Sequence, residues 1–289
     1  MRNKKEIKDK ILIGLITATN EEYQSIYNII KKTGILLFNS KDKTSPFPYF
    51  FSEFDFFGND KKLKINLITI KSGYGKLNAI SAATFLIERY KVDFLINFGA
   101  CGSLTKLNFD KSTKVLKTPS LKIGDFVIPK ILYESSYISF KINQENKDIK
   151  TNEENKDSKK ENSENGKIFV GLNRIESIIH KSIINKYDFV KEVKGCSSDM
   201  DVDSMEKRDF LRIFFGADIC DWESFSIRKV AHLWKIPSLI FRVVSDYANE
   251  SFLIDYKENL INILDNGANF LLHEILPMTC KILISELNF

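Results

Sequence analysis

The segment Ile236-Pro-Ser-Leu-Ile-Phe-Arg-Val-Val-Ser-Asp246 decides the fold of this chain. Residues 239–244 form a mostly apolar, β-branched run of strand length. A strand that is apolar on both faces is typical of the interior of a sheet with helices on each side. The segment ends in Ser245-Asp246, and in open α/β sheets ligands bind at the carboxyl ends of the strands. Taken alone, Asp246 is explained equally well as a turn or helix-capping residue.

The rest of the chain has the alternating pattern of an α/β protein. We expect strands at residues 11–18, 49–57, 63–70, 92–98, 126–132, 190–197 and 217–220, and helices beginning near residues 20, 77, 173, 204, 223 and 256. Only the strands at 49–57 and 63–70 look like an antiparallel pair. Glycine turns are expected at 73–75 and 99–102. The pattern predicts a single three-layer α/β/α domain with a mixed, mainly parallel central sheet.

Composition limits the classes of function. The net charge of +5 comes mainly from residues 1–10, which we interpret as a basic tail before a domain spanning 11–289. No other basic block suggests nucleic-acid binding. The four cysteines and three histidines are scattered, which argues against a metal site and for reduced thiols. No apolar stretch reaches the ~20 residues of a membrane helix, so we expect a soluble, cytoplasmic protein.

Residues 141–167 differ in kind from the rest. Fourteen of these 27 residues are charged and six more are Asn. Such a segment buries too little apolar surface to offset the entropy of ordering it. We interpret it as a disordered, charged insertion within the domain.

Three carboxylates stand at or just beyond the ends of predicted strands: Glu22, Glu223 and Asp246. Glu22 also lies in the first turn of a predicted helix, where an acidic residue is favourable by itself. On one edge of one sheet, these acids and the two glycine turns would form a pocket without metal ligands and without a Cys–His pair.

Six motifs in chain order resemble the methylthioadenosine/S-adenosylhomocysteine nucleosidases of the purine nucleoside phosphorylase superfamily. The resemblance runs from about Ile11 to the end and excludes the tail and the insertion. The motifs are Gly14-Leu-Ile-Thr-Ala-Thr-Asn-Glu-Glu22, Lys71-Ser-Gly-Tyr-Gly-Lys76, Ile96-Asn-Phe-Gly-Ala-Cys-Gly102, Ile123-Gly-Asp125, Asp221-Trp-Glu223 and Arg242-Val-Val-Ser-Asp246.

The resemblance implies hydrolysis of the N-glycosidic bond between adenine and a thio-substituted ribose by a homodimeric enzyme without cofactor or metal. Asp246 would protonate the leaving adenine, Ser245 would orient Asp246, and Glu22 would activate the attacking water. Glu223 would bind the ribose hydroxyls, and Trp222, where the family usually has Met, would pack under the sugar. The remaining substrate-binding positions would be Tyr74, Ala100, Cys101, Gly102, Val202 and Ala248.

One departure from the family pattern concerns the base. The run Ser197-Ser-Asp-Met-Asp201 places Asp201 where the family has a Phe that stacks on adenine. A carboxylate cannot stack in this way, so affinity for adenine or the identity of the base is open.

Two alternatives to nucleoside hydrolysis remain. One is a phosphorylase, or a nucleosidase of altered specificity, on the same fold. None of the seven arginines stands obviously at a strand-end loop, which favours water over phosphate as the nucleophile. The other alternative is an adhesive or binding protein on this scaffold, which the insertion and the basic tail suggest.

Overall fold

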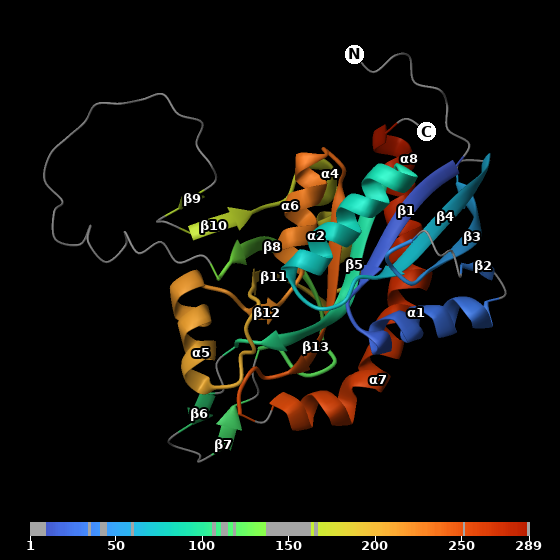
Figure 1. Ribbon diagram of the computed structural model, residues 1–289. Helices are drawn as coiled ribbons and strands as arrows, with labels where there is room; N and C mark the ends of the chain where they lie inside the picture. The colour runs from blue at the N-terminus through green and yellow to red at the C-terminus, as the bar shows by residue number, and fades with distance from the viewer. Residues whose placement is uncertain are drawn as a thin grey trace, which may run out of the picture.

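The computed structural model describes residues 10–33, 36–40, 45–58, 61–105, 108–110, 115–117, 120–136, 163–164, 167–250 and 252–287 (Figure 1). Eleven of the described strands form one mixed sheet. They are β1 (Lys10–Thr17), β2 (Leu36–Ser40), β3 (Tyr49–Gly58), β4 (Lys61–Lys71), β5 (Phe94–Ser103), β8 (Phe126–Glu134), β9 (Ser163–Glu164), β10 (Lys167–Val170), β11 (Val190–Ser197), β12 (Ile219–Asp221) and β13 (Ser238–Asp246). The short strands β6 (Asn108–Asp110) and β7 (Val115–Lys117) pair separately.

Helices cover both faces of the sheet (Figure 1). The described helices are α1 (Asn20–Lys32), α2 (Lys76–Phe85), α4 (Arg174–Lys186), α5 (Met205–Phe210), α6 (Ser224–Leu233), α7 (Phe252–Phe270) and α8 (Leu276–Leu287). Wider π-helical turns extend α2 and α5 and join α7 to α8, namely η1 (Leu86–Tyr90), η2 (Leu211–Phe215) and η3 (Leu271–Ile275).

Two apolar cores account for the three layers. Side chains of α1, α4, α7 and α8 pack on one face of the sheet, and side chains of α2 and α6 pack on the other. The strand β13 lies between these layers, and all nine of its residues are buried. The predicted α/β/α domain with a mixed sheet is thereby confirmed.

Parallel ladders build the centre of the sheet. The strands β4, β1, β5 and β13 pair in parallel in that order, and so do β8, β11 and β12. The carboxyl ends of β1, β5 and β13 therefore lie at the same edge, as the sequence predicts. Antiparallel pairs connect β5 with β12 and β8 with β13. Two other antiparallel pairs, β3 with β4 and β8 with β10, extend the sheet on its two sides.

The prediction of a glycine turn at residues 99–102 is wrong. The strand β5 continues through these residues to Ser103, because Gly102 pairs with Cys220 of β12 in an antiparallel ladder. The strands β2, β6, β7, β9 and β10 were also not expected.

Residues 1–9 of the predicted basic tail and most of the charged segment 141–167 lie outside the described residues, whereas Lys10 begins β1. At the end of the charged segment, β9 pairs in the antiparallel direction with the first two residues of β10. Among the described helices, none has the length and apolar character needed to cross a membrane.

Candidate active site

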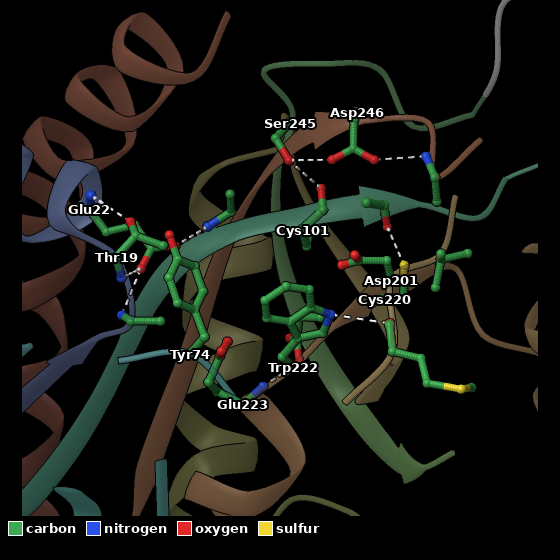
Figure 2. A pocket seen from close by; sticks show the side chains of 17 residues that line it. Thr19, Glu22, Tyr74, Cys101, Asp201, Cys220, Trp222, Glu223, Ser245 and Asp246 are labelled. Carbon is green, nitrogen blue, oxygen red and sulfur yellow. Dashed lines mark hydrogen bonds between the residues drawn. The ribbon is translucent and has the colours of Figure 1, made fainter. Parts of the chain in front are cut away.

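A cavity of about 480 Å³ opens at the carboxyl ends of the central strands (Figure 2). All eleven predicted site residues line it. Six further residues complete the wall: Ala18, Thr19, Met200, Asp201, Cys220 and Asp221. One cavity thus collects side chains from positions 18 to 248 of the chain.

Glu22 is fixed at this edge by the start of α1. Thr19 and Glu22 form a capping box, in which the Thr19 hydroxyl accepts from the Glu22 N–H and the Glu22 carboxylate accepts from the Thr19 N–H at 3.0 Å. The same Oε2 atom accepts from Ala18 N at 2.7 Å, and Oε1 accepts from Ala100 N at 3.0 Å. A carboxylate has about four acceptor positions, so one remains for a ligand. Glu22 is therefore both a helix cap and a cavity residue.

Asp246 is aimed into the cavity by a bulge at the end of β13. The register with β5 shifts there, so that Val244 pairs with Cys101 and Asp246 pairs with Gly102. In a regular strand, Ser245 and Asp246 would point to opposite faces, whereas both line the cavity here. The Ser245 hydroxyl lies 2.7 Å from Asp246 Oδ2, and the Ala248 N–H donates to Oδ1 at 2.8 Å.

Glu22 on α1 and Asp246 on β13 contact the strand β5 at different residues. Glu22 is bonded to Ala100, whereas Asp246 is paired with Gly102. Two residues along a strand span about 7 Å. Figure 2 shows Glu22 on one side of the cavity and Asp246 on the other.

A buried arginine holds the third acid. Glu223 Oε1 accepts from Gly75 N at 3.0 Å, and Oε2 lies 3.4 Å from Arg242 Nη2. Arg242 Nε also lies 3.1 Å from Asp221 Oδ2. Burial raises the pKa of Glu223 to about 7, although Arg242 opposes this change. Burial acts to lower the pKa of Arg242, but the neighbouring carboxylates outweigh it and raise that pKa.

The sequence indicated no arginine near the site, and Arg242 corrects this expectation. It lies inside β13, as the sequence indicates, but its side chain reaches Asp221 and Glu223 beneath the cavity. Asp221 was also missed. Its carboxylate accepts from Ser197 Oγ at 2.6 Å and from the backbone N–H groups of Glu223 and Ser224, which fixes the start of α6. An arginine inside an apolar run is the signal that points to such a buried ion pair.

Two aromatic side chains, Tyr74 and Trp222, form part of the cavity wall. Trp222 Nε1 donates to Met200 O at 3.2 Å, and the rings of Tyr74 and Trp222 meet edge to face with centroids 5.6 Å apart. Val202 is half-buried and packs against the apolar cluster that contains Cys220 and Ala248. This wall suits a flat, partly apolar ligand.

The two cysteines of the cavity are not suited to nucleophilic catalysis. Burial raises the pKa of the thiols of Cys101 and Cys220 well above the usual value. A neutral thiol is a weak nucleophile. No group of three or more His, Cys, Asp or Glu side chains that could hold a metal ion occurs among the described residues.

Gly99 provides a test of how tightly the site is packed. A Cβ at this position would collide with the Arg242 guanidinium and the Glu22 carboxylate. We expect Gly99→Ala to lower kcat/KM by about 100-fold, because a shift of ~1 Å in a catalytic group costs this much. Gly171→Ala is the matched control, since no atom lies within 4 Å of its added Cβ. Steady-state kinetics of both variants measure the effect, and equal activity of the two would contradict the prediction.

Comparisons with known proteins identify a family. The family model for the phosphorylase superfamily matches residues 13–275. A 5'-methylthioadenosine/S-adenosylhomocysteine nucleosidase of Buchnera aphidicola subsp. Baizongia pistaciae is 26% identical over 284 residues, which are 96% of this chain and 94% of that protein. The nucleosidase of the same name from Buchnera aphidicola subsp. Acyrthosiphon pisum is 28% identical over 253 residues, covering 86% of this chain and 90% of that protein.

Solved structures show the same fold. The native futalosine hydrolase of Helicobacter pylori has a TM-score of 0.68 at 20% identity, and the match covers 94% of this chain and 98% of that one. The 5'-methylthioadenosine/S-adenosylhomocysteine nucleosidase of Helicobacter pylori has a TM-score of 0.67 at 21% identity, covering 93% and 99%. These structures show the shared fold, and the curated relatives confirm the resemblance to nucleosidases and the expected class of N-ribosyl hydrolase. Because the family model spans most of its length, this chain belongs to the phosphorylase superfamily.

Proposed function

We propose that this enzyme hydrolyses the N-glycosidic bond of methylthioadenosine and S-adenosylhomocysteine and releases adenine and the thioribose. The observation that carries the proposal is that Glu22 and Asp246 line the same cavity, where Glu22 contacts β5 at Ala100 and Asp246 pairs with β5 at Gly102. One carboxyl group can then act on the leaving base while the other acts on the attacking water. We also propose a single catalytic domain over residues 11–289, interrupted by the charged segment 141–167, in the cytoplasm. Four free, buried cysteines support this location.

Asp246 is the proposed general acid. Cleavage of a glycosidic bond passes through an oxocarbenium-like state, and the departing base becomes a better leaving group when it is protonated. The Ser245 hydroxyl and the Ala248 N–H hold the two oxygens of Asp246, which orients the carboxyl group toward the ligand. The electron pair of the C–N bond moves to the base, which takes the proton from Asp246.

Glu22 is the proposed general base. Its three backbone N–H donors fix its orientation, and its remaining acceptor position can receive a hydrogen bond from water. The water attacks the anomeric carbon and transfers a proton to Glu22. Charge relief at the sugar and proton uptake by Glu22 then occur on the side away from the leaving base.

Phosphorolysis is the second candidate, because Arg242 supplies a cation near the site. However, this guanidinium is already paired with Asp221 and Glu223. Among the described residues that line the cavity, five carry a carboxylate and none is Lys, Arg or His. This arrangement repels phosphate, so water is the better nucleophile.

Product analysis tests the proposal. Methylthioadenosine, S-adenosylhomocysteine and inosine are each incubated with the enzyme, with and without phosphate. We expect adenine to be released from the two thioethers in phosphate-free buffer. Formation of a sugar phosphate only in the presence of phosphate would establish phosphorolysis instead.

The raised pKa of Glu223 leads us to expect that activity depends on pH. We propose that it binds the ribose hydroxyls, for which the ionised carboxylate is needed as a double acceptor. Because its pKa is raised to about 7, the carboxylate becomes protonated as the pH falls through this value. We therefore expect kcat/KM to fall on the acidic side of pH ~7, and Glu223→Gln to be less active but to lack this step. The measurement is kcat/KM against pH for both proteins, and an unchanged acidic step in the variant would contradict the assignment.

We further propose that the enzyme is a homodimer. Four large apolar side chains are exposed at or beside the cavity mouth, on α2 and in the neighbouring loops: Tyr74, Leu77, Ile80 and Met200. Exposed apolar groups that gather in one place are typical of a protein interface. We expect sedimentation to give a dimer for the wild type and for the Ile261→Glu control on α7, and a monomer for Leu77→Glu. A monomeric wild type at micromolar concentration would contradict the proposal.

A further inference from the structure

One carboxylate of the cavity has no partner among the described residues. Glu22, Glu223 and Asp246 each accept backbone N–H groups, and Asp221 is paired with Arg242. These four acids are buried, whereas Asp201 lines the same cavity at an exposed position and its side chain forms no hydrogen bond or ion pair with any described residue. The mechanism above gives it no role. It is therefore available to a ligand.

The backbone around Asp201 is held from several directions. Lys207 Nζ donates to Asp201 O at 3.2 Å, and Trp222 Nε1 donates to the carbonyl of the preceding Met200. Two residues earlier, Asp199 Oδ1 accepts from Lys76 N at 2.9 Å. The loop between β11 and α5 is thus tied to α2, α5 and the start of α6. A side chain on such a support can read a ligand group at a defined position.

The position of Asp201 indicates which part of the ligand it meets. Figure 2 shows Asp201 toward Cys220 and Asp246 and away from Glu22 and Tyr74. Its neighbour Val202 packs against the cluster that contains Cys220 and Ala248, and Cys220 lies beside Asp246 around Gly102. Asp246 is the proposed acid for the leaving group. Asp201 therefore lies on the side of the cavity where the leaving base would meet Asp246.

The chemistry of a free carboxylate defines the preferred base. An ionised carboxylate only accepts hydrogen bonds, so it favours a ligand atom that carries N–H and disfavours a ligand oxygen. When the base excludes water, a carboxylate without a donor stays unpaired, which is costly.

Resting on the proposed function, we propose that Asp201 is a specificity-determining residue that accepts a hydrogen bond from the exocyclic amino group of the base. The enzyme then selects 6-aminopurine nucleosides over their 6-oxo counterparts, whose oxygen would face the carboxylate at position 6. A contact with the N1–H of a 6-oxopurine would give the opposite preference and would overturn the proposal. A hydrogen bond to a charged group corresponds to about 10–100-fold in binding, which sets the size of the selection.

Kinetics with a matched pair of substrates test the proposal. The full chain, Asp201→Asn and the control Asp203→Asn are compared on methylthioadenosine and methylthioinosine, which differ only at position 6 of the purine. Asp203 is paired with Lys207 and does not line the cavity. We expect the wild type and the control to favour the amino substrate. In Asp201→Asn the ratio of the two kcat/KM values should fall by about 10–100-fold, because an amide can also donate to oxygen.

A second readout separates this proposal from the proposed function. Calorimetric titration with free adenine and free hypoxanthine measures the same preference without turnover. If the wild type hydrolyses neither nucleoside, the proposed function fails, while a preference for adenine that Asp201→Asn abolishes still supports the role of Asp201. If the wild type hydrolyses methylthioadenosine but Asp201→Asn keeps both ratios unchanged, the role of Asp201 is overturned and the hydrolysis stands.

Discussion

Asp246→Asn is expected to lower kcat for methylthioadenosine by about 10²–10⁴-fold, the usual size of general acid assistance. Asparagine keeps the volume of the side chain and one oxygen, so the Ala248 N–H retains an acceptor. An amide cannot deliver a proton to the departing base. The effect should therefore fall on kcat, with a small change in substrate affinity.

Leaving-group dependence gives the sharper measurement. A ribosyl substrate with a good leaving group, such as 4-nitrophenolate, departs without protonation, so Asp246→Asn should cleave it at close to the wild-type rate. Asp209→Asn is the control, because Asp209 lies on the surface of α5 and pairs with Arg212. Equal losses on both substrates would show that the variant damages the site in general and would remove the acid role from Asp246.

Glu22→Gln is expected to cause a loss of similar size, about 10²–10⁴-fold in kcat. Glutamine has one acceptor oxygen where glutamate has two, so it cannot accept from Ala100 N and from the two N–H groups of Ala18 and Thr19 together. It also cannot take a proton from water. Because part of the capping box is lost, the free energy of unfolding should fall by about 1 kcal/mol.

The adjacent Glu21 separates these two effects. Glu21 is also in the first turn of α1, but it is exposed and does not line the cavity. Glu21→Gln should therefore retain full activity. Thermal unfolding and kinetics are measured on both variants. If Glu22→Gln loses stability but keeps more than about a tenth of kcat, far above the range for an essential base, Glu22 is a cap alone.

Much of the fold followed from local sequence. The strands β1, β3, β4 and β13 and the helices α1 and α4 agree closely with their expected ranges, because each is a long apolar run or a clear amphipathic repeat. The boundaries at Thr19 and Asn173 follow from capping boxes, which are also local. The strand β5 was expected to end at a glycine turn, because a glycine pair does not reveal the partner strand that continues it.

The meeting of Glu22 and Asp246 at one sheet edge could also be predicted, because β1, β5 and β13 are parallel and their carboxyl ends share an edge. Glu223 is different, because it follows β12, which pairs with β5 in the antiparallel direction. The role of Arg242 could not. Its position in an interior strand is visible in the sequence, but its partners Asp221 and Glu223 are about twenty residues away and meet it only when α6 packs against β13. The sequence likewise could not show that the Asp201 carboxylate lacks a partner among the described residues, because hydrogen-bond partners are visible only in the folded structure.

The sequence by itself determined the order of strands and helices, the buried centre and the identity of the polar groups at the strand ends, since these depend on periodicity and on single side chains. Only the tertiary structure decided how those groups are aimed. The bulge at Ser245 turns Asp246 into the cavity, and Ala100 and Gly102 set its spacing from Glu22. Such details depend on the pairing of segments far apart in the chain, which no local pattern specifies.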